Sequence, residues 1–265
     1  MLVLFVGDIV GSTGRRALKE NLPELKQKLR PDLIVVNGEN AAGGRGLTEA
    51  IANEFFEAGV HGITMGNHTW DHKDIFNFID TESRLVRPLN FPPGTPGQGF
   101  ALLKSANGKE LMIVNVMGRS FMPALDCPFR TMDAVLEKAK KKTKAIFVDV
   151  HAETTSEKLA LAWYLDGRVS AVVGTHTHVQ TNDEQLFPNG TAYVTDVGMT
   201  GSREGILGME REAVIRKFVT QLPVRFTAAE GKYQFHGAAI DIDDQTGLSK
   251  AIRLIRIYEG EFRMS

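Results

Sequence analysis

The sequence predicts an α/β fold in which two mixed sheets pack face to face and helices cover them from outside. Short apolar runs alternate with helical stretches over most of the chain, which is typical of layered sheets with helices on their faces. A hairpin pattern in the middle and an all-β tail add antiparallel strands. A simple doubly wound sheet leaves no place for these strands, so a sandwich of two sheets fits better.

Five short runs predict strands that are buried on both faces. They are rich in β-branched or aromatic residues and are bounded by Gly, Asn or Asp. In chain order these runs are Leu2 to Val6, Leu33 to Val36, Gly62 to Met65, Ile146 to Val150, and Val169 to Val173. Ala192 to Thr195 predicts a further strand.

Five helices are predicted between these runs. In the first, fourth and fifth of these helices, apolar residues recur three and four residues apart, as in helices with one buried face. We expect Ser12 or Thr13 to cap the first helix, because hydroxyl side chains accept from free amides at a helix start. The predicted helices are Thr13 to Leu29, Thr48 to Ala58, Asp71 to Ile79, Arg130 to Lys142, and Thr154 to Leu165.

Two hairpins complete the prediction. Phe100 to Leu103 and Leu111 to Val116 flank Asn107-Gly108, a strong signal for a tight turn. In the tail, Phe235 to Ile242 and Ile252 to Tyr258 flank Gln245-Thr246-Gly247. Both hairpins make the sheets mixed rather than purely parallel.

Composition limits the classes of protein that remain. With 265 residues and 43% hydrophobic content, the chain can form one compact domain over residues 1–265. A net charge of -1 excludes a broad basic surface for duplex nucleic acid. The single Cys127 excludes an internal disulfide, and Leu2 to Val6 is too short for a signal or membrane segment. We therefore expect a cytoplasmic protein without a membrane partner; a homo-oligomer stays open.

Polar residues that bind metals follow the predicted strands. Because the carboxyl ends of the strands in an open α/β sheet form one edge, these residues are expected to converge. They are Asp8, Glu39, Asn40, Asn67, His68, His151, His176 and His178.

Gly174 to His178 is the strongest local signal. Two histidines one residue apart on an extended segment point to the same side, and neutral imidazole is a common metal ligand. With His151, the set holds three histidines, two carboxylates and two Asn side chains, which exceeds one tetrahedral zinc site. Two metal ions that share a carboxylate would use all of them. Taken alone, Asn37 to Asn40 also fits a solvated turn, and His61 and His236 fit structural roles.

The order of these motifs resembles the calcineurin-like metallophosphoesterase superfamily. Its usual signature is D-x-H, G-D, G-N-H-[DE], a lone His and G-H-x-H, on a four-layered αββα sandwich of two mixed sheets flanked by helices. The sequence departs from this signature in four ways. Val10 replaces the first His, Glu39 replaces Asp, Thr69 replaces the acid after His68, and Thr175 is an additional residue before His176. With Asn37 to Ala41, Gly66 to His68 and Thr195 to Gly201, it looks like the YmdB-like bacterial 2′,3′-cyclic-nucleotide 2′-phosphodiesterases.

This resemblance implies roles for the candidate residues. One metal ion would be held by Asp8, Glu39, Asn40 and His178, and the other by Glu39, Asn67, His151 and His176. Glu39 would bridge the two ions, and His68 would be the general acid. Donors of oxygen and nitrogen without thiolate favour Mn, Fe or Zn, and amide ligands favour Fe or Mn. The resemblance also implies iron or manganese, as a divalent or mixed-valence pair.

The implied reaction is hydrolysis of a small cyclic nucleotide. A hydroxide bridging the ions would attack a 2′,3′-cyclic nucleotide and release the 3′-nucleotide, with His68 donating the proton. Two other classes stay open. A metal-dependent amide hydrolase also uses His-x-His, although that motif belongs on the first strand of a barrel. A metal-bound nucleotide-sensing module with little turnover would fail to hydrolyse a chromogenic phosphodiester. The sequence predicts no substrate-contacting residues.

Overall fold

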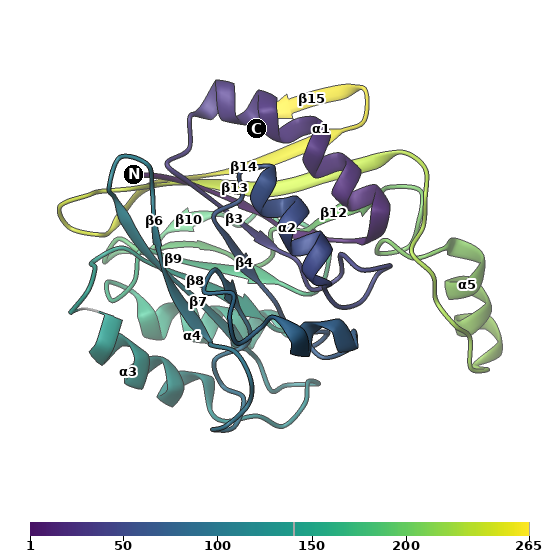
Figure 1. The fold of residues 1–265 in the computed structure, drawn as a ribbon, viewed down its shortest axis with the longest axis horizontal. Helices are drawn as coiled ribbons and strands as arrows, with labels where there is room; N and C mark the ends of the chain where they lie inside the picture. The colour runs from purple at the N-terminus through teal and green to yellow at the C-terminus, as the bar shows by residue number, and fades with distance from the viewer. Residues whose placement is uncertain (140, 265) are drawn as a thin grey trace.

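The computed structural model describes residues 1–139 and 141–264, and it consists of two mixed sheets packed face to face (Figure 1). The first sheet has the order β15-β14-β13-β1-β3-β4-β5, with β2 and β12 joined beside β13. Its strands are β1 (Leu2–Val6), β2 (Asp8–Ile9), β3 (Leu33–Asn37), β4 (Gly62–Thr64), β5 (Leu85–Val86), β12 (Met199–Ser202), β13 (Tyr233–Ile242), β14 (Ser249–Tyr258) and β15 (Glu261–Met264).

The second sheet has the order β10-β11-β9-β8-β7-β6. β7, β8, β9 and β11 run parallel, and antiparallel strands stand at both edges. The strands are β6 (Phe100–Lys104), β7 (Glu110–Met117), β8 (Ile146–His151), β9 (Ala171–Thr175), β10 (Gln185–Leu186) and β11 (Ala192–Val194).

Helices form the two outer layers. α1 (Gly11–Leu29) and α2 (Glu49–Glu57) cover the first sheet, while α3 (Pro128–Ala139) and α4 (Thr155–Leu165) cover the second (Figure 1). α5 (Arg211–Thr220) stands away from the four layers. None of the helices in the described chain is long and apolar enough to cross a membrane.

Three apolar layers hold the sandwich together. One lies under α1 and α2, one under α3 and α4, and the third lies between the sheets. Phe5 of β1 meets Phe147 of β8 in that middle layer, with ring centroids 4.9 Å apart. Burial of apolar surface, mostly from aliphatic side chains, is the main force that joins the sheets. The four-layered αββα prediction is therefore confirmed.

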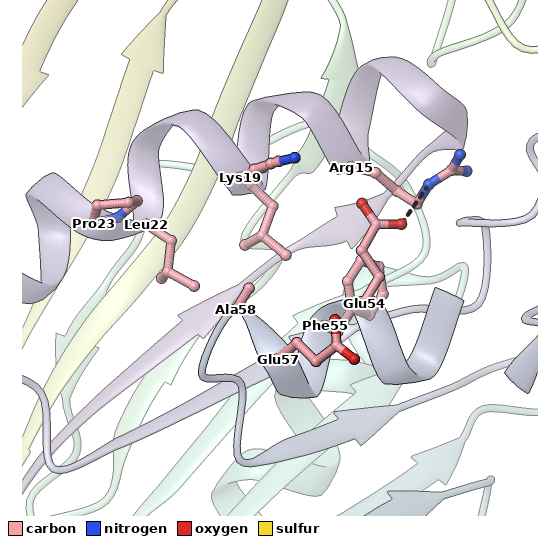
Figure 2. Close-up of a pocket in the computed structure, with 9 residues that line it drawn as sticks. Arg15, Lys19, Leu22, Pro23, Glu54, Phe55, Glu57 and Ala58 are labelled. Atoms are coloured by element: carbon pink, nitrogen blue, oxygen red, sulfur yellow. Dashed lines mark ion pairs between the residues drawn. The ribbon is translucent and has the colours of Figure 1, made fainter. Parts of the chain in front are cut away.

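A cavity of about 410 Å³ lies between α1 and α2 on the outside of the first sheet (Figure 2). Leu18 and Leu22 of α1 and Phe55 of α2 line it, and an ion pair of 3.4 Å joins Arg15 to Glu54 beside it. None of the predicted metal-binding residues lines this cavity. It is a gap in helix packing rather than the candidate site.

Several predicted element boundaries were wrong. The helix over Asp71 to Ile79 is only a 3-10 turn, η1 (Lys73–Asn77), because the backbone of His72 is extended before it and Phe78 leaves helical angles after it. α1 begins at Gly11 and has no side-chain cap, so neither Ser12 nor Thr13 caps it. β9 begins and ends two residues later than predicted. α5 was not predicted, and Lys140, in the predicted end of α3, lies outside the described residues.

Candidate metal centre

The polar ends of the strands meet at one edge of the sandwich. Asp8 lies in β2, Glu39 and Asn40 follow β3, Asn67 and His68 follow β4, His151 ends β8, and His176 and His178 follow β9. This convergence follows from the parallel arrangement of the strands that carry them.

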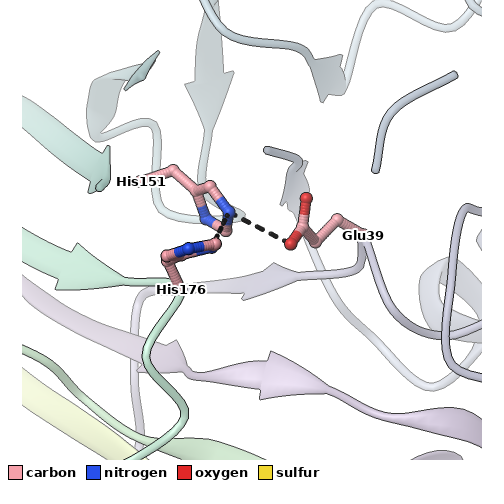
Figure 3. A group of neighbouring side chains, drawn as sticks. All are labelled: Glu39, His151 and His176. Carbon is pink, nitrogen blue, oxygen red and sulfur yellow. Dashed lines mark hydrogen bonds and ion pairs between the residues drawn. The ribbon is translucent and has the colours of Figure 1, made fainter. Parts of the chain in front are cut away.

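The most compact group is formed by Glu39, His151 and His176 (Figure 3). Nε2 of His151 lies 3.1 Å from Oε1 of Glu39 and 3.1 Å from Nδ1 of His176. One potential ligand atom from each of the three residues lies within 4.8 Å of the others. Oδ1 of Asn67 lies 2.8 Å from the same Nε2 atom. The four residues thus face a common centre.

A second group adjoins the first through Glu39. Nδ2 of Asn40 lies 3.3 Å from Oε1 of Glu39 and 3.2 Å from Nε2 of His178. The same His178 nitrogen lies 3.9 Å from Oδ1 of Asp8. As a metal ligand, Asn40 would use its side-chain amide oxygen. A half-turn of the amide places this oxygen where Nδ2 now lies. The structure therefore brings together all seven predicted ligand residues in two adjoining groups.

Each of the three histidines has its outer nitrogen occupied by the protein. Nδ1 of His151 lies 2.9 Å from the Thr175 hydroxyl, Nε2 of His176 lies 3.0 Å from Glu153, and Nδ1 of His178 lies 2.9 Å from the carbonyl of Leu207. A carbonyl and a carboxylate can only accept, so the outer nitrogens of His176 and His178 donate. The inner nitrogens are then free to bind a metal.

Thr175 connects His151 to a buried carboxylate. Its hydroxyl donates to Oδ1 of Asp149 at 2.6 Å, so it must accept from Nδ1 of His151. Asp149 is fully buried and also accepts from the Thr64 hydroxyl at 2.5 Å and from Asn37 at 3.2 Å. Burial raises the pKa of Asp149 to about 6, which leaves it an anionic acceptor at neutral pH. Asp149 thus joins the ends of β3, β4, β8 and β9.

The charges at the centre favour a cation. Asp8 is fully buried, burial raises its pKa, and its Oδ1 makes no hydrogen bond with any residue in 1–139 or 141–264. Burial opposes ionisation of both Glu39 and His151, but their mutual attraction outweighs it. The pKa of Glu39 falls to about 2 and that of His151 rises to about 9. A buried carboxylate oxygen without a hydrogen bond to the described chain, beside imidazole nitrogens that face the same centre, fits a bound metal cation.

His68 stands beside the ligands in a different role. Its backbone amide donates to Oε2 of Glu39 at 2.9 Å, and its Nδ1 lies 2.8 Å from Oδ2 of Asp71. Asp71 thus orients the ring through Nδ1 and leaves Nε2 available for the predicted role of general acid. Asp71 was not predicted as a site residue. The usual motif has an acid directly after the histidine, where this chain has Thr69. The acid three residues after the histidine, Asp71, was the signal that could have identified it.

A buried ion pair between Lys158 and Asp196 stabilises the loop that carries His176 and His178. Nζ of Lys158, on α4, lies 2.8 Å from Asp196, which also accepts from the amide and hydroxyl of Thr177. Sequence reasoning missed Lys158, although it shares the buried stripe of α4 with Leu161, Ala162 and Leu165. A lysine in such a stripe indicates a buried partner.

The expectation that His176 and His178 lie on an extended segment was wrong. Both residues have left-handed backbone angles, with φ of 97° and 67°. Non-glycine residues adopt such angles at a cost that surrounding contacts must offset. The bonds from Asp196 to Thr177, between the two histidines, supply those contacts.

A two-sheet sandwich flanked by helices, with histidines and carboxylates at its strand ends, is the metallophosphoesterase fold. Solved structures agree: a phosphatase from Mycoplasma pneumoniae matches with a TM-score of 0.91 and 36% identity, over 97% of this chain and 93% of that one. A family model described as YmdB-like protein matches residues 4–255, and the chain belongs to this family, as predicted.

Two further relatives cover nearly the whole chain. The chain is 59% identical over 257 residues to a 2′,3′-cyclic-nucleotide 2′-phosphodiesterase of Bacillus subtilis (strain 168), covering 97% of this chain and 96% of that protein. A hypothetical protein from Thermus thermophilus matches with a TM-score of 0.91 and 48% identity, over 97% and 99% of the two chains.

Proposed function

We propose that the protein is a dinuclear metal-dependent phosphodiesterase that hydrolyses 2′,3′-cyclic nucleotides to 3′-nucleotides. The observation that carries this proposal is the arrangement of His151, His176 and His178. Each binds a protein acceptor through its outer nitrogen. The inner nitrogens of His151 and His178 face Glu39 and Asp8, and that of His176 faces Nε2 of His151. Such outer partners are the usual companions of metal-binding histidines.

In this proposal, two ions are held by the two groups of residues described above, with Glu39 shared between them. Asp8, Asn40 and His178 complete one set, and Asn67, His151 and His176 complete the other. The donors carry oxygen and nitrogen without sulfur, so iron or manganese is the first choice and zinc the second. When bound, the ions supply an acidified water and positive charge for the phosphate.

The chain itself supplies the proton for the leaving alkoxide. His68 is one quarter exposed and is not needed as a ligand, so it can meet a substrate. Asp71 holds its Nδ1, and the bond from the His68 amide to Glu39 fixes the acid beside the shared carboxylate. A positioned acid of this kind typically contributes about 10²–10⁴-fold.

The name of the Bacillus subtilis relative supports the choice of substrate. A cyclic phosphate carries strain in its five-membered ring, and strain of this kind lowers the barrier to opening it. An amidohydrolase barrel is excluded by the two open sheets of the described chain. A sensing module without turnover is the alternative that the next experiment decides.

The experiment is product analysis with defined metals. Metal-free protein is loaded with Mn, Fe or Zn and incubated with 2′,3′-cyclic AMP, and the products are separated by chromatography. We expect 3′-AMP with at least one metal, and none after chelation. Intact substrate with every metal would support the sensing module, and cleavage of monoesters alone would contradict a phosphodiesterase.

A further inference from the structure

A second cavity adjoins the metal centre across the ring of His178. It has a volume of about 540 Å³, within the usual range for small-molecule sites. His178 forms part of its wall, together with Arg203, His236, Arg256 and Tyr258. His178 is therefore shared by the candidate metal centre and this cavity.

The cavity lies between the loop after β9 and residues of β12, β13 and β14. Along the inner face of β13, Ala238 and Ile240 pack in the middle apolar layer. The same face continues with His236 and Gln234, which pair in register with Arg256 and Tyr258 of β14. The inner face thus changes from apolar to polar at the end nearest the metal centre. Every second side chain along a strand points to the same face of the sheet.

Arg203 and Tyr258 provide a flat surface in this cavity. The guanidinium of Arg203 lies 4.4 Å from the centre of the Tyr258 ring. Within the described chain, it has neither a hydrogen bond nor an ion pair. No carboxylate among the described residues lines the cavity, whereas Arg256 is held in place by the side chain of Asn182, at 3.0 Å. Arginine planes and aromatic rings are surfaces on which bases stack.

His236 is a buried side chain without a hydrogen-bond partner among the described residues. Its side chain lies on the cavity wall and is 7% exposed, and neither ring nitrogen bonds to any part of the chain that the structure describes. Burial and the nearby Arg256 lower the pKa of His236 to about 4, so the ring is neutral. A neutral imidazole has one donor and one acceptor, and leaving both unpaired in the interior is unfavourable.

We propose that this cavity, the nucleoside cavity, receives the ribose and base of the cyclic nucleotide while its phosphate lies at the metal centre. The inference rests on the proposed function. A cyclic nucleotide carries its charge at the phosphate, so what remains for the cavity is a neutral, planar heterocycle. The Arg203–Tyr258 surface suits its face, and the unpaired imidazole suits a group with both donors and acceptors. Such contacts favour nucleosides without strong selection among bases.

Two variants test the nucleoside cavity. Arg203→Ala removes an exposed side chain, and Tyr258→Leu removes the ring while retaining apolar bulk. Each should raise KM for 2′,3′-cyclic AMP roughly tenfold, as expected for loss of one stacking contact. Neither should change kcat/KM for bis(p-nitrophenyl) phosphate, which has no nucleoside. The matched control is Arg253→Ala, which removes an exposed arginine of β14 outside the cavity.

A second measurement separates this inference from the proposed function. Ligand-observed NMR with adenosine and metal-free protein should show binding to the wild-type chain and to Arg253→Ala, and loss of binding in Arg203→Ala and Tyr258→Leu. This result is independent of hydrolysis. Equal losses on both phosphodiesters, unchanged KM in both cavity variants, or adenosine binding that survives both substitutions would overturn the nucleoside cavity. Absence of hydrolysis with adenosine still bound would overturn only the proposed function.

Discussion

The hydroxyl of Thr175 lies 2.9 Å from Nδ1 of His151 and connects it to the carboxylate of Asp149. Thr175 is the residue by which this chain departs from the usual G-H-x-H motif. It extends β9 to the level of His151 on β8, with which it pairs in register. The additional residue therefore orients the ring of His151, a predicted metal ligand on the neighbouring strand.

Replacing Thr175 should weaken metal binding without removing any ligand. Thr175→Val keeps the shape but loses the acceptor for His151, and outer partners of this kind contribute about 10–100-fold in metal affinity. Competition with a chelator measures the change, and Thr175→Ser is the matched control that should restore affinity. Equal affinity in the Val and Ser variants would mean that the hydroxyl does not orient the ring.

Glu39→Ala should remove the residue shared by the two groups of ligands. Both proposed ions lose a donor, so bound metal should fall by well over half. Elemental analysis of the purified protein provides the number of ions per chain. Glu153→Ala, which changes only an outer partner of His176, should retain more metal. A stoichiometry near two in Glu39→Ala would contradict the dinuclear assignment.

His68→Ala should slow hydrolysis by roughly 10²-fold or more while both ions remain bound. The loss should shrink for nitrophenyl esters, because a good leaving group needs little protonation. Asp71→Asn should show the same pattern to a smaller extent, since Asp71 only orients the ring. If good and poor leaving groups suffer equally, His68 positions the substrate instead of donating a proton.

The metal-free protein should lose stability between pH 6.5 and about 9. Burial disfavours the charged ring of His151, but Glu39 and Asp8 outweigh burial and raise its pKa from 6.5 to about 9. A raised pKa stabilises the folded state fully below 6.5, and this contribution disappears as pH passes 9. Urea unfolding at several pH values measures it. The decline should be smaller in His151→Asn, and an equal decline in that variant would assign it to other groups.

The same proton should leave when a metal binds. Below pH 9, His151 must give up its proton before its inner nitrogen can coordinate. Calorimetric titration of metal in buffers of different ionisation enthalpy counts the released protons. The expected count decreases toward zero for this group above pH 9, and no release at pH 7 would mean that His151 is neutral in the metal-free protein.

Lys158→Met should destabilise the fold, because Asp196 is left as a buried and unpaired charge. Breaking a buried pair by removing one partner typically costs about 3–5 kcal/mol. Lys250→Met is the control, since its ion pair with Asp243 is exposed and should matter little. Thermal unfolding compares the two variants. A similar loss in both would show that the Lys158 pair is no more important than a surface pair.

The strands and the ends of the strands were predictable because their signals are local. A strand buried on both faces is a short apolar run, as Leu2 to Val6 shows, and the residues after each run reach a common edge in this class of fold. The extent of η1 was not predictable in this way, because the extended backbone of His72 and the non-helical angles of Phe78 end it, and the residue pattern shows neither.

The sequence by itself determined the four layers and brought the seven candidate ligands and His68 to one edge, since apolar periodicity and strand ends are encoded residue by residue. Only the tertiary structure decided what surrounds them. The bonds that Asp149, Glu153 and Asp196 accept join segments that are separate along the chain, and residues from β12, β13, β14 and the loop after β9 line the proposed nucleoside cavity. Contacts of this kind depend on packing geometry, which no local pattern of residues records.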